Sequence, residues 1–222
     1  MNMFSAFKSK VGETIVQFDD LTRFAGEMWL SDGCVFVSTL ILADSWTRKN
    51  HHGRITSVHV VDPVFLEFGD PNDRKRMIDS SGVLSRVVDT RVILVPVYID
   101  VDIKHWCAAV IDMGSKIIWI YDPKTREDYL DVVETIMKEK IVPLVDKECV
   151  LTIRRCSAWH QTDGYNCGVL VVKWFEAFLN VATNTKLGED LTELTPEQIS
   201  VEDLNESGYK MFQSVFMDVS TG

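Results

Sequence analysis

Arg91–Tyr98, with the sequence RVILVPVY, is the stretch that decides the fold class of this chain. Its apolar residues are mostly β-branched, and a short, nearly unbroken apolar run of this kind predicts a buried β-strand. Working outward from it, Trp106–Ile111 and Lys116–Tyr121 (KIIWIY) predict two more strands, and Val150–Arg154 predicts a fourth. The centre of the chain is therefore expected to form a β-sheet.

Helices are expected on both sides of this strand-rich centre. Ser31 is expected to cap a buried helix that runs to about Trp46, with the negative charge of Asp32 in its first turn. The other predicted helices are a short one starting at Pro71, an amphipathic one over Asp128–Lys140 that stops before Pro143, an apolar one over Gly168–Val181, and a last one capped by Thr195. Residues 47–62 are expected to be a surface loop. Helices, then strands, then helices indicate an α+β fold.

The composition is that of an ordinary globular protein. The chain has 222 residues, 46% hydrophobic and 25% charged, which is enough to bury a substantial core. We expect a single domain, with residues 1–26 as an N-terminal extension, 27–178 as the core, and 184–222 as a loop and C-terminal helix. The net charge of −10 argues against binding to nucleic-acid phosphates, which requires a basic surface.

No stretch of the sequence predicts a membrane span or an export signal. The longest apolar run near the start, Val35–Ala43, is too short to cross a bilayer and contains Ser38 and Thr39. The five cysteines are odd in number and form no CxxC pair, so a disulfide framework is not expected. These features predict a chain that stays inside the cell, in the cytoplasm, the nucleus or both.

The segment Asp112–Ser115, between the second and third strands, has the composition of a tight hairpin turn. If Met113 and Gly114 form a two-residue turn, counting outward along both strands places His105 opposite Asp122. Opposed residues have Cβ atoms about 4.5–5.5 Å apart, so the carboxylate would reach the imidazole. A longer turn or a bulge would shift this register. A carboxylate behind a histidine prepares it as a catalytic base; the alternative is an exposed pair at a strand end.

Cys167 follows a polar, glycine-containing turn and starts the apolar helix. The helix dipole and the free N–H groups at such a position lower the pKa of a thiol and favour the nucleophilic thiolate. Gln161 and the backbone N–H of Cys167 are candidates for the two donors that stabilise an oxyanion, and Gly168 would let a substrate carbonyl approach. On these residues alone, a buried core thiol and a solvated glutamine remain as alternatives.

Taken together, these segments resemble the SUMO-specific (Ulp/SENP-type) cysteine proteases. That family's pattern is a Trp-Leu-x-Asp segment, a His-Trp pair, an Asp at a strand end, and a Gln six residues before a Cys-Gly. All four occur here in order between about Glu27 and Phe178, at Trp29–Asp32, His105–Trp106, Asp122 and Gln161–Gly168. The resemblance implies a papain-like cysteine protease fold, with a small mixed sheet flanked by helices.

The resemblance also implies a catalytic role for four residues. Cys167 would be the nucleophile and His105 the general base and acid. Asp122 would orient the histidine, and Gln161 would donate a hydrogen bond to the oxyanion. No metal and no cofactor would be required.

Three further residues match positions that line the substrate channel in that family. Trp29 and Trp106 would enclose the Gly-Gly tail of a ubiquitin-like modifier, because a channel between flat rings admits glycine and excludes larger residues. Asp32 would lie near the channel, or would act only as a charge at the helix start. The implied partner is SUMO with its conjugates, with NEDD8 or ubiquitin as alternatives, and the chain is expected to act as a monomer.

The sequence departs from the family pattern at three positions, where Asn166 replaces a common Asp, Ser31 a common Asn, and Pro123 a common Ser. These departures leave the identity of the modifier open. Two other functions remain as alternatives: an effector-type acetyltransferase on a related fold, and an inactive modifier-binding domain. His51, His52 and His59 have no Cys or acid at ligand spacing, so a surface loop is preferred to a metal site there.

Overall fold

A computed structural model describes residues 6–12, 14–25, 27–49, 57–80, 91–145, 150–185 and 199–220. The elements in these ranges, in chain order, are β1 (Ala6–Lys8), β2 (Ile15–Gln17), α1 (Phe18–Arg23), α2 (Asp32–Lys49), β3 (Ser57–Val60), the 3₁₀-helix η1 (Pro63–Glu67), α3 (Pro71–Ser80), β4 (Arg91–Asp100), β5 (Lys104–Asp112), β6 (Ile117–Tyr121), α4 (Glu127–Ile136), the π-helix η2 (Met137–Ile141), α5 (Val142–Val145), β7 (Thr152–Cys156), α6 (Cys167–Asn184) and α7 (Val201–Ser220).

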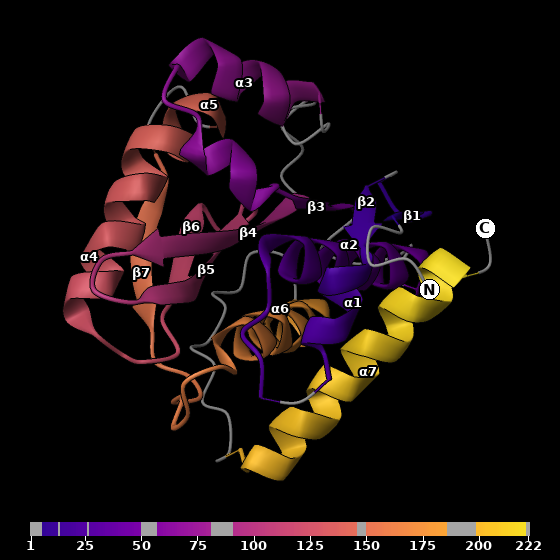
Figure 1. The fold of residues 1–222 in the computed structure, drawn as a ribbon. Coiled ribbons are helices and arrows are strands. Elements are labelled where there is room, and N and C mark those ends of the chain that lie inside the picture. The colour runs from indigo at the N-terminus through magenta and orange to yellow at the C-terminus, as the bar shows by residue number, and fades with distance from the viewer. Residues whose placement is uncertain are drawn as a thin grey trace.

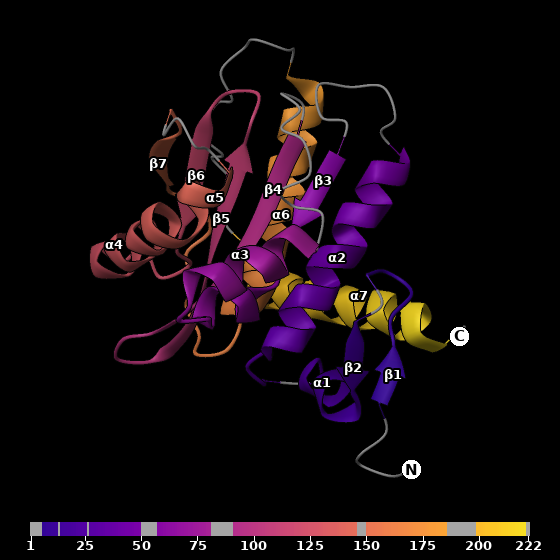
Figure 2. The same cartoon turned by 90° about the horizontal axis from the view of Figure 1, so that it is seen from above.

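Over these ranges, the main sheet contains five strands in the order β3-β4-β5-β6-β7 (Figure 2). The central strands β4, β5 and β6 are antiparallel neighbours. The outer strands β3 and β7 pair in parallel with β4 and β6. The predicted strands are therefore confirmed, and the sheet is mixed.

Alternate residues of the central strands face two separate cores. Along β5, Trp106 and Ala108 join the core that contains α2 and α6, whereas Cys107 and Ala109 join the core that contains α4. Figure 1 shows α4 on one side of the sheet and α6 with α7 on the other. Because both faces are buried, RVILVPVY is an unbroken apolar run rather than an alternating one. The arrangement confirms the predicted α+β class with a small sheet flanked by helices.

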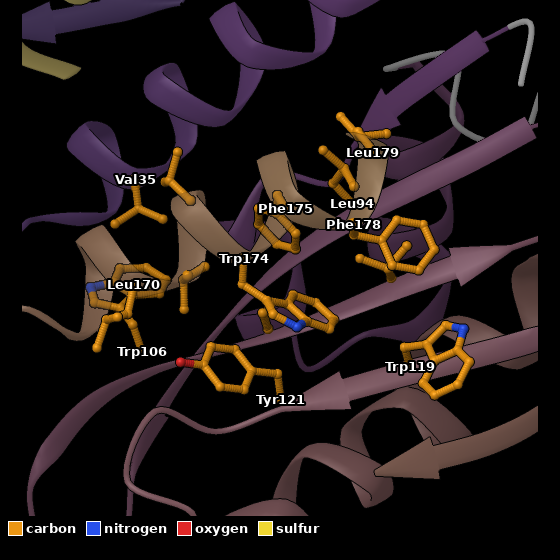
Figure 3. Packing of buried hydrophobic residues seen from close by; sticks show 14 of the residues in the cluster. Val35, Leu94, Trp106, Trp119, Tyr121, Leu170, Trp174, Phe175, Phe178 and Leu179 are labelled. Atoms are coloured by element: carbon orange, nitrogen blue, oxygen red, sulfur yellow. The ribbon is translucent and has the colours of Figure 1, made fainter. Parts of the chain in front are cut away.

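Aromatic packing holds α6 against the sheet (Figure 3). The ring of Trp174 stacks on Tyr121 of β6 with centroids 5.2 Å apart, and Phe175 and Phe178 pack beside it. Burial of each large side chain of this kind is worth about 1.5–3 kcal/mol. The position of α6, and hence of Cys167 at its first residue, is set by these contacts.

The predicted register of the β5–β6 hairpin is wrong by two residues. Asp112 pairs with Ile117 rather than with Ser115. The cause is the side chain of Asp112, whose carboxylate accepts from the N–H of Gly114 at 2.9 Å and from the hydroxyl of Ser115 at 2.7 Å. These bonds build a longer turn, in which Lys116 takes the left-handed conformation with φ of 59°.

The predicted helices are confirmed in outline, with one correction. Ser31 caps α2 as expected, since its hydroxyl accepts from the N–H of Cys34 at 3.2 Å, and α3 begins at Pro71. The prediction that the Asp128–Lys140 helix stops before Pro143 is wrong. The chain continues from α4 through η2 into α5, which contains that proline. The π-helical turn changes the backbone hydrogen bonding just before the ring, where a regular α-helical ladder would lose a bond.

The prediction of a surface loop over residues 47–62 is wrong at both ends. Helix α2 extends through Lys49, and Ser57–Val60 forms β3, which includes His59. The short sequence SVHV carries little strand signal of its own, and its strand state depends on pairing with β4. His51, His52 and the predicted cap Thr195 lie outside the described residues.

In the ranges given above, no helix is long and apolar enough to cross a membrane. Cys34, Cys107, Cys156 and Cys167 are buried cysteines.

Candidate active site

Cys167 begins α6, as predicted, and its side chain is buried. Asn166 is the N-cap of the helix, and its carbonyl accepts the N–H of Leu170 at 2.9 Å. The thiol therefore lies in the first turn, where backbone N–H groups are not used by the helix itself.

The structure gives a packing reason for a glycine at position 168. A Cβ at this position would lie 3.0 Å from Val35 and 3.2 Å from Leu30. The absence of a side chain allows α6 to approach α2 and the segment before it. Gly168 thus positions the thiol by close packing, and the predicted approach of a substrate carbonyl at this residue stays a prediction.

His105 and Asp122 form a buried pair at the ends of β5 and β6. The Nε2 of His105 lies 2.6 Å from Oδ1 of Asp122, and both side chains have no exposed surface. The carboxylate also accepts from the N–H of Lys124 at 2.9 Å and of Arg126 at 2.8 Å. The hairpin shift of two residues left both side chains on one face of the sheet, since the side-chain period of a strand is two.

These contacts set the tautomer of the imidazole. The oxygens of Asp122 accept from two backbone N–H groups as well as from the ring, so the ring proton of neutral His105 is placed on Nε2. The other nitrogen, Nδ1, is buried and has no hydrogen-bond partner among the described residues. That nitrogen is available to accept a proton.

The thiol of Cys167 lies beside the peptide that joins His105 to Trp106. The N–H of Trp106 faces the sulfur and favours its ionised form. The structure thus brings Cys167, His105 and Asp122 to one corner of the sheet.

Burial controls the ionisation of the cysteines here. Burial raises the pKa of the Cys167 thiol to about 11, although the N–H groups of Trp106 and Gly168 and the indole of Trp29 oppose the rise. Burial also raises the pKa of the Cys107 thiol, and the charge of Asp122 adds to that effect. Cys107 is therefore a protonated neighbour of the carboxylate, whereas Cys167 is the thiol with stabilising N–H groups around it.

The raised pKa makes a prediction about alkylation. Only the thiolate reacts with iodoacetamide, and a pKa of about 11 keeps the Cys167 thiol protonated at neutral pH. We expect its alkylation rate to rise roughly tenfold per pH unit above about pH 7. Peptide mass spectrometry with time resolves this site from the other cysteines. A rate that levels off near neutral pH would show instead a thiolate–imidazolium pair in the free protein.

Gln161 lies next to the turn that follows Asp122, and its side chain is hydrogen-bonded within its own loop. Its backbone N–H donates to the carbonyl of Pro123 at 2.7 Å, which ties the loop to the turn after Asp122. Its side-chain Nε2 donates to Asp163 at 3.1 Å, and its Oε1 is buried without a partner among the described residues. Pro123 fits the second position of that turn, where its fixed φ is favourable.

Trp29 and Trp106 stack on each other with ring centroids 5.7 Å apart and an angle of 21° between planes. Tyr98 contacts both rings. With Asp32 these residues line a cavity of about 210 Å³, whose other walls are Pro63, Val64 and Glu67. The structure therefore places the predicted Trp29, Trp106 and Asp32 around one cavity, next to the thiol.

Trp106 is fully buried, and its indole Nε1 donates to the carbonyl of Leu30 at 2.9 Å. It lies on the α6 side of the sheet, opposite to His105, as adjacent strand residues do. Trp29 is only half-buried. Of the two rings, Trp106 is the fixed wall and Trp29 the outer one.

Sequence reasoning missed the residues that support His105 from behind. The ring of Tyr129 on α4 lies 5.3 Å from the imidazole, centroid to centroid. Arg126 stacks over that ring at 3.9 Å and binds Asp102 in the loop before β5. The hydroxyl of Tyr129 also donates to Asp102. No spacing in the sequence links the segment of Asp102 and His105 with that of Arg126 and Tyr129, so only the fold reveals the cluster.

The side chains of His105, Cys107 and Asp122 place three potential metal ligands within 4.8 Å of one another. The carboxylate oxygens are already used by the imidazole and by two backbone N–H groups. A metal ion would have to replace these bonds in a fully buried space. Two of these three groups, His105 and Asp122, already bond to each other as a histidine held by a carboxylate.

A buried thiol at a helix start, next to a strand histidine held by a carboxylate, defines the class of the protein as a cysteine peptidase. The sequence model of the Ulp1 protease family, C-terminal catalytic domain, matches residues 36–206. The chain belongs to the Ulp1 protease family. Among curated proteins, no sequence matches this chain.

Solved structures show the same fold at low sequence identity. The yeast Ulp1 protease domain in complex with Smt3, the yeast ortholog of SUMO, has a TM-score of 0.66 and 15% identity, and the match covers 98% of this chain and 90% of that one. The Chaetomium thermophilum Ulp1-like SUMO protease catalytic domain has a TM-score of 0.67 and 16% identity, over 100% and 85%. The Xanthomonas campestris effector XopD bound to ubiquitin has a TM-score of 0.55 and 17% identity, over 82% and 90%.

Proposed function

We propose that this protein cleaves the peptide or isopeptide bond after the C-terminal Gly-Gly of a ubiquitin-like modifier, with SUMO as the first candidate. The observation that carries the proposal is the buried His105–Asp122 pair at the peptide beside the Cys167 thiol. NEDD8 and ubiquitin are the alternatives, because the same fold is found both in a complex with a SUMO ortholog and in one with ubiquitin.

In the proposed mechanism, Nδ1 of His105 takes the proton from Cys167 as the sulfur attacks the glycine carbonyl carbon. Asp122 stabilises the imidazolium through Nε2. The imidazolium then gives its proton to the leaving amine, and the carbon–nitrogen bond breaks to leave a thioester. A water molecule, deprotonated by His105, hydrolyses the thioester and frees the modifier and the thiol.

Two donors are available for the oxyanion that forms during each attack. One is the backbone N–H of Cys167. The other is the second N–H of the Gln161 amide, since Asp163 occupies only the first. Loss of one such donor typically costs about 10²–10³-fold in rate.

The substrate tail would enter between Trp29 and Trp106. A chain held between two flat faces needs about 3.5–4.0 Å to each of them. The present separation of 5.7 Å between ring centroids does not provide that space. We therefore expect the outer ring, Trp29, to move when a Gly-Gly tail binds, while Trp106 stays hydrogen-bonded to Leu30.

The test of the proposal uses SUMO, NEDD8 and ubiquitin that carry a C-terminal electrophile. We expect a covalent adduct with one or more of them, with SUMO fastest, and none with Cys167→Ser. Tight binding without an adduct would favour the inactive modifier-binding domain. Acetylation of a target that requires acetyl-coenzyme A would favour the acetyltransferase. Either outcome would contradict the proposed protease.

We further propose that the chain acts as a monomer inside the cell, in the cytoplasm, the nucleus or both. The free thiols of Cys34, Cys107 and Cys167 support a reducing compartment. Sedimentation of the protein with and without its modifier, and imaging of the tagged full chain in its own cells, test the two parts of this statement.

A further inference from the structure

The carboxylate of Asp163 is the centre of the loop before Cys167. Its Oδ1 accepts from Nε2 of Gln161 at 3.1 Å, from the N–H of Tyr165 at 2.9 Å and from the N–H of Asn166 at 2.8 Å. Its Oδ2 accepts from the side-chain Nδ2 of Asn166 at 2.9 Å. One side chain therefore joins the oxyanion candidate, the loop backbone and the residue before the nucleophile.

The contact with Gln161 decides which way the amide of that side chain points. Because an ionised carboxylate only accepts, the amide must turn its nitrogen toward Asp163 and its oxygen away. Partial burial opposes ionisation of Asp163, but the hydrogen bonds from Asn166, Gln161 and Tyr165 outweigh it and lower its pKa. The carboxylate is therefore charged at neutral pH. One N–H of the Gln161 side-chain amide donates to Asp163, and this contact sets the direction of the second N–H.

The contact with Asn166 explains a departure from the family pattern. Asn166 is 4% exposed and caps α6 through its carbonyl, while its side chain does not cap the helix. Its amide instead donates to Asp163. An aspartate before the cysteine would bring two carboxylates to about hydrogen-bond distance, which is unfavourable in a partly buried loop. The negative charge of this contact thus sits on residue 163 rather than next to the thiol.

We propose that Asp163 is a positioning residue for the proposed cleavage, and that Asn166 is the donor that holds it in place. Asp163 fixes the Gln161 amide with one N–H toward the oxyanion and fixes the start of α6 that carries Cys167. The inference rests on the proposed protease function, and it concerns the rate of the chemical step rather than binding of the modifier.

The test exchanges the two side chains. Asp163→Asn leaves an acceptor for Gln161 but places an amide N–H₂ against that of Asn166, and Asn166→Asp places two carboxylates together. We expect each single variant to lower kcat by about tenfold or more, with little change in KM, because each misaligns the oxyanion donor. The double exchange restores one acceptor opposite one donor and should recover most of kcat.

A second readout is the pH profile of Asn166→Asp. Protonation of one carboxylate would restore a donor, so the deficit of this variant should shrink as pH falls, whereas that of Asp163→Asn should not. Among the titratable groups near this contact, Tyr165 lies beside Asp163, Arg23, Glu27 and Tyr209 line the pocket at Asn166, and the Cys167 thiol follows Asn166 in the chain. They are unchanged in both variants. Their contribution therefore cancels in the comparison.

Controls separate the inference from the function on which it rests. Thr162→Ala changes an exposed residue of the same loop and should keep the wild-type kcat. Thermal unfolding of every variant shows which losses come from the fold. The inference is overturned if Asp163→Asn keeps full kcat, or if the double exchange is no better than the worse single variant, while the wild type is active. A wild type that cleaves no modifier would overturn the proposed function itself, and the positioning role with it.

Discussion

Replacing Cys167 with serine is expected to reduce turnover of the preferred modifier substrate by about 10⁴-fold or more. A serine hydroxyl has the same place in the first turn of α6, but it holds its proton far more tightly than a thiol. His105 alone does not ionise it at a useful rate in a site built for sulfur. Since the walls of the cavity are unchanged, the variant should still bind substrate and retain it uncleaved. Steady-state kinetics measure the loss of turnover, and the affinity of the variant for uncleaved substrate measures the retained binding.

Cys34→Ser is the matched control for that variant. Cys34 is also a buried thiol in the first turn of a helix, and burial raises its pKa to about 12. Its hydrogen-bond partners are Ser31 and Asp20. Turnover near the wild-type rate is expected for this control. Normal turnover by Cys167→Ser would contradict the assignment of the nucleophile.

Replacing Asp122 with asparagine is expected to lower kcat by about 10²–10⁴-fold while the protein stays folded. The carboxylate accepts from His105 and Lys124 at one oxygen and from Arg126 at the other. An amide has only one oxygen, so its N–H₂ must face a donor on one side. If it faces His105, Nε2 must give up its proton and Nδ1 must carry it. The ring then has no free nitrogen toward the thiol.

Asp122→Ala extends the same prediction. It leaves the imidazole and two backbone N–H groups without their buried acceptor, which typically costs about 3–5 kcal/mol of stability. We expect a folded, slower protein with a lower unfolding temperature. Asp131→Asn, an exposed carboxylate on α4, is the control and should keep the wild-type kcat. An Asp122→Asn variant with an unchanged kcat would show that the pair is structural only.

The strands of the central sheet were predictable because burial on both faces leaves a continuous apolar run, as in RVILVPVY. Pairing of His105 with Asp122 was also predictable, although the register was not. The Asp112 side chain builds a longer turn than its neighbours suggested, and this shifted every pair by two. An even shift keeps each residue on its face. A shift of one would have separated the two side chains.

The segments with weak local signal were not predictable. Ser57–Val60 becomes a strand only because β4 lies beside it in parallel, and the sequence before Pro143 continues as helix only through a π-turn. For the same reason, the support of His105 by Tyr129 and Arg126 was missed. These contacts join segments that no short-range pattern connects.

The roles of two family departures also required the structure. Pro123 replaces a common serine, and in the fold it occupies a tight turn and accepts the N–H of Gln161. Asn166 replaces a common aspartate, and in the fold it donates to Asp163. In the sequence, each change is only a departure from the family pattern. In the structure, each changed residue takes part in a hydrogen bond, Pro123 with Gln161 and Asn166 with Asp163.

The sequence by itself determined the chemistry that is available to this protein: a thiol at the start of an apolar helix, a histidine and a carboxylate on neighbouring strands, and the two tryptophans Trp29 and Trp106. The spacing of apolar and polar residues matches the local backbone geometry of strands and helices, so this pattern is present in the sequence before the chain folds. Only the tertiary structure decided which nitrogen of His105 is free, how deeply the thiol is buried, and which N–H of Gln161 is taken. Those properties depend on groups that are distant in sequence and meet only when the two cores close on the sheet.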